Sequence, residues 1–471
     1  MKNIKVNEIS REIVINYLAD SKKESMILFG PPGIGKTQCI REGALACASS
    51  LNKVFIDYSK FCLLSEEEQY KVIKDAGKEV FFFVDMNLQT RDPVDFYGRP
   101  VNGVIKGNGS GDTLVTDFIP PRAVAYLCQF PGIIFMDEIT NVHRPDLISI
   151  AMRLSQERKV SDYAISDDVM IIMAGNRPEH SALARALPAP MINRCILYDV
   201  VATSAEEWID YITGRYNVEE FIEIVGYLAS LAGNFQKIEN GREMRAFATP
   251  RSCEKLLNKI IGFRGLVEKG FISANEAENR IDRISIGLIG DKEGSLFNTW
   301  RKNFAYISYD KLVQEIKGGI PSVVCGISAF IGKELAKVIE GKRSRFTKDE
   351  LVELIKLIDR SGPEYISVML TTSSIMKFDK YDNIVSSLKN FYKIKNFING
   401  EAQDIPDFDH KEIYTLLKGG RDNFIKHLNI GVDKFIRDMA EIYYNRCVNT
   451  SLDVIVRELS KGLSLDDVIE R

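Results

Sequence analysis

Roughly the first two hundred residues alternate short, densely apolar runs with longer segments that carry apolar residues at helical spacing. This alternation is typical of a parallel β-sheet with helices on both faces. Apolar runs without strict alternation indicate strands that are buried on both faces. We therefore expect an α/β fold here, with strands at Ser25–Phe29, Lys53–Asp57, Gly132–Met136, Asp168–Ala174 and Arg194–Asp199, and an extra strand at Glu79–Val84.

The pattern changes after about Thr203. Apolar residues at spacings of three and four predict amphipathic helices over Ala205–Tyr211, Val218–Ala232 and Arg251–Phe263. From Asp291 onward the chain has a helical pattern and no recognisable motif. We expect this region to recognise a target only because the first part of the chain is committed to other chemistry. We expect an α/β core over residues 1–202, a helical part over 203–290 and an α-helical region of unknown role over 291–471.

Composition and charge exclude several classes of protein. The 471 residues are 45% apolar, and 62 basic against 65 acidic side chains give a net charge of −3. This balance gives no electrostatic case for a dedicated nucleic-acid or membrane-surface protein, although a local basic patch stays open. The apolar runs Val80–Val84 and Val323–Ile331 are too short to span a bilayer, and residues 1–11 lack the apolar core of a secretory signal. We expect a soluble, cytoplasmic protein.

Cysteine and histidine offer no site of their own. The eight cysteines are scattered without a C-x-x-C pair, so reduced thiols are expected. The four histidines share no ligand spacing, and none lies beside a Cys or Ser in a recognisable nucleophile setting; they are His143, His180, His410 and His427.

The stretch "LFGPPGIGKTQ", Leu28–Gln38, satisfies the pattern G-x-x-x-x-G-K-(S/T) and stands between an expected strand and an expected helix. Glycines let backbone N–H groups approach anionic oxygens at the positive end of a helix. Lys36 would supply charge to the β- and γ-phosphates, and the Thr37 hydroxyl would reach Mg²⁺. ATP and Mg²⁺ are therefore the expected ligands, and the alternative is a glycine-rich turn with a surface lysine. The nucleotide-binding residues would be Gly30, Pro31, Pro32, Gly33, Ile34, Gly35, Lys36, Thr37 and Gln38.

Two further strands end in polar residues. "GIIFMDE" presents Asp137 and Glu138 at the carboxyl end of a buried strand, where ligands gather in open α/β sheets. Asp137 would hold the metal through water, and Glu138 would polarise the attacking water as a general base. "VMIIMAGNRPE" ends in Asn176, whose amide can hydrogen-bond both the γ-phosphate and that water. The alternatives are two solvated acids and a turn-forming asparagine.

In this order, the motifs resemble the Walker A, Walker B and sensor 1 elements of AAA+ ATPases, and more narrowly the MoxR branch. The resemblance covers roughly residues 10–260. It implies a P-loop NTPase core with a five-stranded parallel sheet in the order 5-1-4-3-2, a helical lid over 203–290, and a ring, usually hexameric. The stretches that carry the narrower resemblance are "DFYGRP" (Asp95–Pro100), "DEITNVHRPDLISIAMRLSQERKV" (Asp137–Val160), "AGNRPE" (Ala174–Glu179), "LPAPMINRC" (Leu187–Cys195) and "TPRSCEKL" (Thr249–Leu256).

The resemblance also implies roles for two arginines. Arg194 falls where the family has its arginine finger, which acts on the nucleotide of a neighbouring subunit; Arg185 is a nearby competitor, and a side chain without a role at a strand start is the alternative. Arg251 falls at the sensor 2 position in the lid, in the first turn of a helix that Thr249 would cap. An ion pair with Glu254 is the alternative for Arg251.

Two loops resemble family insertions. The polar segment between Asp85 and Asp117 would hold pore-facing loops, in which Tyr97, Arg99 and Lys106 would touch a substrate or partner, but a surface hairpin explains it equally well. "SQERKVSDYAISDD" resembles the hairpin before the sensor strand, with its turn at Ser161–Tyr163.

The family's MoxR branch consists of chaperone-like remodelers. The resemblance implies a separate protein partner, often a von Willebrand factor A domain protein, because no D-x-S-x-S stretch occurs in this chain. A nucleic-acid motor or helicase loader is the alternative, with "GKRSRFTK" (Gly341–Lys348) as the densest basic run, and a scaffold that uses ATP only to assemble is a third.

Overall fold

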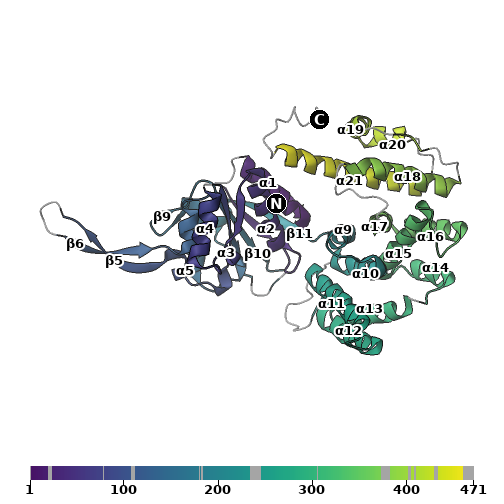
Figure 1. Ribbon diagram of the computed structural model, residues 1–471, viewed down its shortest axis with the longest axis horizontal. Helices are drawn as coiled ribbons and strands as arrows, with labels where there is room; N and C mark the ends of the chain where they lie inside the picture. Colours follow the sequence, from purple (N-terminus) through teal and green to yellow (C-terminus); the bar gives the residue numbers. More distant parts are fainter. Residues whose placement is uncertain are drawn as a thin grey trace. The chain divides into compact units, whose positions relative to one another are not determined.

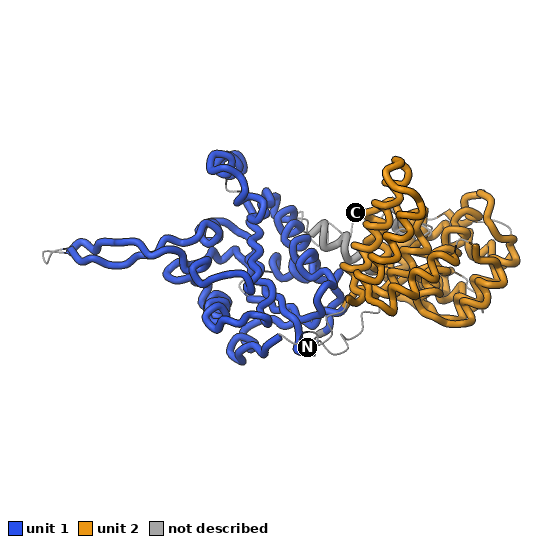
Figure 2. The backbone as a smooth tube through the Cα atoms, turned by 90° about the horizontal axis from the view of Figure 1, so that it is seen from below, with its two compact units in different colours: residues 1–201, 237–243, 457–471 blue, residues 202–236, 244–456 orange. Residues whose placement is uncertain are grey.

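The chain folds into two compact units, which Figure 2 shows in different colours. The structure is a computed structural model that describes residues 2–19, 24–77, 79–107, 112–179, 181, 184–233, 246–304, 306–372, 382–400, 405–407, 410–428 and 433–459. Unit 1 comprises Met1–Val201 with the short segments Lys237–Glu243 and Arg457–Arg471, and unit 2 comprises Ala202–Gln236 and Met244–Val456.

Unit 1 is built on a seven-stranded parallel sheet (Figure 1). Its central strands are buried without interruption, because helices cover both faces, as the apolar runs predicted. The strands, in spatial order, are β1 (Lys2–Lys5), β11 (Cys195–Val201), β2 (Ser25–Phe29), β10 (Val169–Gly175), β7 (Gly132–Asp137), β4 (Val80–Asn87) and β3 (Val54–Asp57).

The sheet corrects the predicted five strands and their order 5-1-4-3-2. The five expected strands keep their relative order, but β4 lies between β7 and β3, and β1 adds a seventh strand beside β11. The run "VFFFV" at the start of β4 is buried on both faces, which suits an interior position and not an added edge. β1 is short and polar, "KNIK", so no apolar pattern marked it.

Helices cover the sheet on two sides because successive side chains of a strand point to opposite faces. On one side lie α1 (Ile9–Leu18) and α2 (Lys36–Ser50), where Tyr17 packs on Phe81 with ring centroids 5.4 Å apart. On the other side Phe82 contacts Phe61 and Tyr126. The helices of this second side are α3 (Tyr58–Phe61), α4 (Glu66–Ala76), α6 (Arg122–Leu127) and α7 (Pro145–Glu157).

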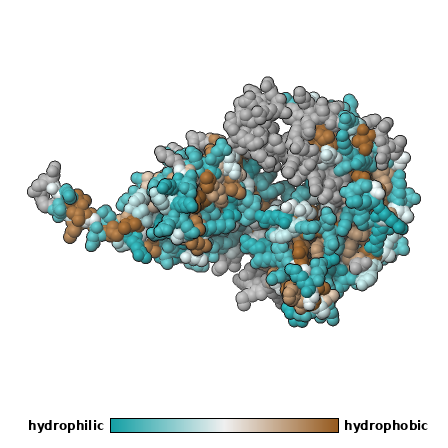
Figure 3. Space-filling model, in the orientation of Figure 1, coloured by the Kyte–Doolittle hydropathy of each residue, from teal (hydrophilic) through white to brown (hydrophobic). Residues whose placement is uncertain are grey.

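Two antiparallel hairpins leave the sheet. The long one, β5 (Arg99–Ile105) with β6 (Thr113–Ile119), follows α5 (Val94–Tyr97) and extends away from the rest of unit 1 (Figure 1). Apolar patches lie along it in Figure 3. The side chains of Val104 and Leu114 in this hairpin are 52% and 81% exposed. The short one, β8 (Lys159–Val160) with β9 (Tyr163–Ala164), turns at Ser161 and Asp162, whereas the predicted turn also included Tyr163, which belongs to β9. The Tyr163 hydroxyl donates to the carbonyl of Phe118 and so joins the two hairpins.

Unit 2 is helical, and its described helices share one hydrophobic cluster. The three helices predicted after Thr203 are confirmed, although the one predicted over Arg251–Phe263 continues to Glu268. The division into a lid and a further region stays a prediction. The helices are α9 (Ala205–Arg215), α10 (Ile222–Gly233), α11 (Pro250–Glu268), α12 (Ala274–Ile289), α13 (Asp291–Phe304), α14 (Tyr309–Gly318), α15 (Pro321–Ile339), α16 (Lys348–Ser361), α17 (Pro363–Thr372), α18 (Asp382–Asn399), α19 (His410–Lys418), α20 (Arg421–His427) and α21 (Lys434–Leu459).

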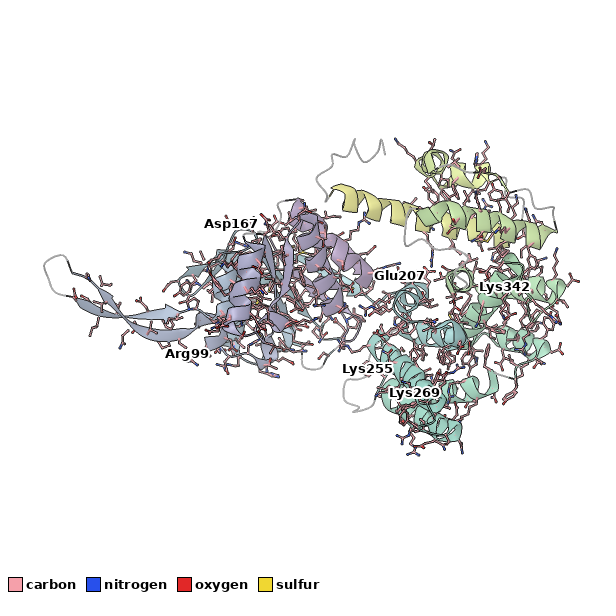
Figure 4. The ribbon with its side chains drawn as sticks, in the orientation of Figure 1. Arg99, Asp167, Glu207, Lys255, Lys269 and Lys342 are labelled. Carbon is pink, nitrogen blue, oxygen red and sulfur yellow. The ribbon has the colours of Figure 1, made fainter. Side chains whose placement is uncertain are left out.

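The basic run Gly341–Lys348 spans most of the loop between α15 and α16, and hydrogen bonds hold this loop in place. Glu334, only 2% exposed, accepts hydrogen bonds from the Arg345 backbone at 2.6 Å and the Ser344 hydroxyl at 3.0 Å. The Arg345 guanidinium donates to the Ile307 carbonyl at 2.6 Å, and Lys342 (Figure 4) pairs with Glu340. Part of the charge in this run is therefore engaged within unit 2. In the part of the chain that the structure describes, no helix combines the length and the apolar character needed to cross a bilayer.

The central position of β4 can be tested at Phe82, which is fully buried. Phe82→Ala is expected to lower the free energy of unfolding of unit 1 by about 3–5 kcal/mol, because it leaves a cavity among aromatic rings. Urea denaturation followed by circular dichroism, with hydrogen exchange of β4 and β7, measures this. Leu63→Ala, at a side chain that is 83% exposed, is the control and should change stability by less than about 0.5 kcal/mol. Equal effects of the two substitutions would contradict an interior β4.

Candidate nucleotide-binding site

The loop between β2 and α2 has the backbone of a phosphate cradle. Gly33 and Gly35 have φ of 78° and 102°, a region that favours glycine, and α2 begins directly afterwards at Lys36. At Gly30 an added Cβ would lie 2.7 Å from the carbonyl oxygen of Val200, so a side chain there would displace the backbone of β11. The glycines at these positions are therefore required by the path of the loop.

Lys36 points back over this loop. It is 8% exposed, and its Nζ donates to the carbonyl oxygens of Gly30 and Pro31, each at 2.8 Å. An ammonium group held within the loop lies where the phosphates of a nucleotide would meet the N-terminus of α2.

Thr37 and Asp137 come together as the sequence led us to expect. The Thr37 hydroxyl donates to Asp137 Oδ2 at 3.0 Å, across a separation of 100 residues. Among the described residues no group of three or more His, Cys, Asp or Glu side chains could hold a metal ion by itself. The pair fits Mg²⁺, which usually takes one or two carboxylates together with substrate phosphates and water.

Glu138 is held in an unusual backbone conformation. Its φ of 61° lies in the left-handed region, which non-glycine residues seldom adopt, and its N–H donates to Asp137 Oδ1 at 2.9 Å. Its Oε2 accepts hydrogen bonds from Nδ2 of Asn176 at 3.2 Å and from Nδ2 of Asn141. The structure thus brings the expected base and the expected sensing amide into contact, and adds Asn141.

Thr140 fixes the strand ends to each other. Its hydroxyl accepts from the Asn176 N–H at 2.8 Å, and an added Cβ on Gly175 would lie 2.7 Å from its side chain. The Gly30 N–H donates to the Gly175 carbonyl at 3.1 Å, which connects β10 to the start of the phosphate loop. No sequence motif pointed to Thr140, because its importance comes from neighbouring strands that are distant in sequence.

Three carboxylates line the same sheet edge on neighbouring strands. Asp57 pairs in register with Phe83 and Asp85 with Phe135, so Asp57, Asp85 and Asp137 point to the α2 side. Arg41 neutralises Asp57 at 2.7 Å. Burial, together with the negative charges of Asp137 and Asp57, raises the pKa of Asp85 to about 6. The apolar run ends at Val84 but β4 continues to Asn87, so the sequence pattern did not mark Asp85.

The two candidate arginine fingers lie in different places. Arg194 is exposed at the start of β11, where Cys195 pairs with Ser25, whereas the phosphate loop follows the other end of β2. Its guanidinium donates to the side chain of Gln156. Since strands rise about 3.3 Å per residue, Arg194 lies more than about 10 Å from its own loop. The backbone N–H of Arg185 donates to the Thr140 carbonyl at 2.8 Å, close to the site.

Arg251 belongs to unit 2 and is exposed in the first turn of α11. Thr249 caps this helix by accepting from the Ser252 N–H at 3.0 Å, as predicted. Glu254, the alternative partner of Arg251, accepts instead from the Tyr216 hydroxyl at 2.9 Å. Lys255, one turn after Arg251, is labelled in Figure 4. The predicted role of Arg251 toward a nucleotide stays a prediction.

The residues proposed to touch a partner lie at the long hairpin. Arg99 is exposed at its base (Figure 4), Lys106 is exposed just after β5, and Tyr97 is half-buried in α5. Among the histidines, His143 is exposed and His180 lies outside the described residues.

Family comparison agrees with the geometry of this site. Residues 26–195 match the family described as ATPases associated with various cellular activities, abbreviated AAA. This part of the chain is similar to an AAA domain. The match runs from β2 to the first residue of β11 and so includes the phosphate loop, Asp137, Glu138, Asn176 and Arg194.

Solved structures give weaker likenesses to the whole chain. A candidate ATPase from Cytophaga hutchinsonii is 13% identical, with 63% of this chain and 81% of that chain covered and a TM-score of 0.26. For Cdc6p from Pyrobaculum aerophilum the identity is 13%, the coverage 74% and 84%, and the TM-score 0.33. The Aeropyrum pernix ORC2 protein, solved as ADPNP and ADP complexes, has 10% identity, coverage of 77% and 81%, and a TM-score of 0.33. At TM-scores this low the likeness carries nothing about activity. No curated protein matches the chain.

The raised pKa of Asp85 gives a pH-dependent stability. The folded pKa lies above the unfolded value, so the ionised carboxylate destabilises the fold at neutral pH and the protonated form does not. Asp85→Asn is therefore expected to raise Tm near pH 8, with the gain shrinking as the pH falls through about 6 and vanishing near about 4. Scanning fluorimetry without added nucleotide or Mg²⁺ measures this. Asp75→Asn, at an exposed position of α4, is the control, and a gain that is constant with pH would contradict the assignment.

Proposed function

We propose that the protein binds ATP with Mg²⁺ and hydrolyses it to ADP and phosphate. The observation that supports this most directly is the convergence of three strand ends. The loop after β2 brings Lys36 and Thr37, β7 brings Asp137 and Glu138, and β10 brings Asn176. Such a set can hold a polyphosphate, place a metal ion and activate a water molecule.

Each side chain has a distinct role in this proposal. Lys36 and the loop N–H groups hold the phosphates, while Thr37 and Asp137 hold Mg²⁺, which neutralises charge on the phosphate oxygens when it is bound. Glu138 accepts a proton from the attacking water. Asn176 donates to Glu138, and its amide would respond to the terminal phosphate. Arg251 would sense the nucleotide from unit 2.

We further propose that the protein acts as a ring, and that Arg194 completes the site of a neighbouring copy. The support is its place at the sheet edge opposite to its own phosphate loop, where it cannot reach its own nucleotide. A guanidinium that neutralises transition-state charge in trans is worth on the order of 10³–10⁵ in rate in GTPases. A hexamer is the ring size that the resemblance to the MoxR branch favours.

We propose that the work done with ATP is the remodelling of a separate protein partner. The exposed apolar side chains of the long hairpin, Val104 and Leu114, suit contact with a protein better than contact with a phosphate backbone. In the basic run Gly341–Lys348, Arg345 donates to the Ile307 carbonyl and Lys342 pairs with Glu340. These two charges are therefore less available to a phosphate backbone, which argues against a nucleic-acid motor. A von Willebrand factor A domain protein is the type of partner that the family resemblance favours.

Glu138→Gln separates binding from hydrolysis. The variant is expected to bind ATP and Mg²⁺ within about threefold of the parent and to lose at least about 100-fold in kcat, because an amide cannot take the proton. Fluorescent-nucleotide titration and phosphate release measure the two quantities. Glu79→Gln, at an exposed residue paired with Lys53 in the same unit, is the control. Turnover equal to that of the parent would show that Glu138 is not the general base.

The same variant tests the class of partner. Loaded with ATP, Glu138→Gln should retain a protein partner on affinity capture, and retained nucleic acid would instead favour a nucleic-acid motor.

A mixing experiment tests the ring and Arg194 together. Arg194→Ala and Lys36→Ala should each be inactive alone, but a mixture should recover about a quarter of the parent turnover, since one copy supplies the loop and the next supplies the arginine. Replacing Arg194→Ala by Arg185→Ala in the mixture is the matched control. Recovery only with Arg185→Ala would transfer the role to Arg185, and no recovery with either would argue against a shared site.

A further inference from the structure

The short turn after β7 carries a buried amide directed at the proposed base. Asn141 closes the 3-10 turn η4 (Ile139–Asn141) and is 6% exposed. Its Nδ2 donates to Glu138 Oε2, the same oxygen that accepts from Asn176 Nδ2 at 3.2 Å. Two amides from different segments therefore hold one oxygen of Glu138.

The orientation of the Asn141 amide follows from this contact. An ionised carboxylate has only acceptors, so Nδ2 and not Oδ1 must face Glu138. Oδ1 is buried, and no donor in the described part of the chain reaches it. A buried acceptor without a donor costs stability, so an apolar side chain of the same size would serve packing better. This makes a purely structural role a poor explanation for Asn141.

The backbone of Asn141 is fixed from two sides. Its N–H donates to the Glu138 carbonyl at 2.9 Å, which closes the turn. Its carbonyl accepts from Gln89 Nε2 at 3.4 Å, and Gln89 belongs to η3 (Leu88–Thr90), directly after β4. The amide therefore has a defined place relative to the ends of both β7 and β4.

We propose that Asn141 is a positioning residue for Glu138. Together with Asn176 it holds Oε2, so that the direction of the carboxylate toward the attacking water is set by two donors. One amide donor would restrict rotation of the carboxylate less than two donors do. The hydrogen bonds of Asn141 that the structure describes go to Glu138 and Gln89, so we expect its loss to change nucleotide affinity little. This inference rests on the proposed hydrolysis of ATP.

Two variants that keep the branched shape of the side chain test the proposal in the full-length protein. Asn141→Leu removes the donor and the unpaired acceptor together, and Asn141→Asp replaces the donor by a charge that repels Glu138. Both are expected to lower kcat about 10- to 100-fold, with KM and the Kd of a fluorescent ATP analogue within about threefold of the parent. The Tm of Asn141→Leu should stay within about 4 °C of the parent or rise. Asn16→Asp on α1, where Asn16 donates to a backbone carbonyl, makes the same chemical change away from the site and should leave kcat unchanged.

The outcomes separate this inference from the proposed function. If either variant keeps parent kcat, Asn141 does not position the base, whereas a parent protein without ATP turnover would overturn the proposed function itself. A fall in kcat that comes with an equal loss of nucleotide affinity, or with a fall in Tm of more than about 10 °C in both variants, would assign Asn141 a structural role and overturn the proposal.

Discussion

The parallel register of three buried strands is the constraint on which the rest of unit 1 depends. Phe29 of β2 pairs with Gly175 of β10, and Met173 of β10 pairs with Met136 of β7. Because the strands run in the same direction, their carboxyl ends meet at one edge, and the residues that follow them become neighbours. Lys36, Glu138 and Asn176 have no other reason to lie close together. The parallel register that buries the apolar strands therefore also brings together the polar side chains at their carboxyl ends.

The close contacts at that edge make the arrangement sensitive to size. Gly175 has no room for a Cβ beside Thr140, and Gly30 has none beside the carbonyl of Val200. Glu138 adopts a left-handed conformation, and the chain turns into η4 immediately after Asp137. An uncommon backbone conformation in the middle of a hydrogen-bonded network is what a preorganised site requires, because the groups need not move when charge develops.

Much of this site was predictable because its signals are local in sequence. The strand "SMILF", the glycines and lysine after it, and the acids after "GIIFM" are each contiguous, and their structure follows from nearest neighbours. The position of β4 was not predictable, since an apolar strand does not state which strands will flank it. Asp85 was missed because β4 continues beyond its apolar run. Asn141 was missed because its meaning depends on the backbone turn at Glu138 and on Asn176, which is 35 residues further along the chain. The helices of unit 2 could be predicted from apolar residues at spacings of three and four. No motif in that part of the sequence indicates what the helices bind.

The hydroxyl of Tyr163 connects the long hairpin to the segment that leads into the sheet. It donates to the carbonyl of Phe118 near the base of β6, and Tyr163 itself lies a few residues before β10, the strand that Asn176 follows. A displacement at the base of the long hairpin would therefore strain a hydrogen bond close to the start of β10.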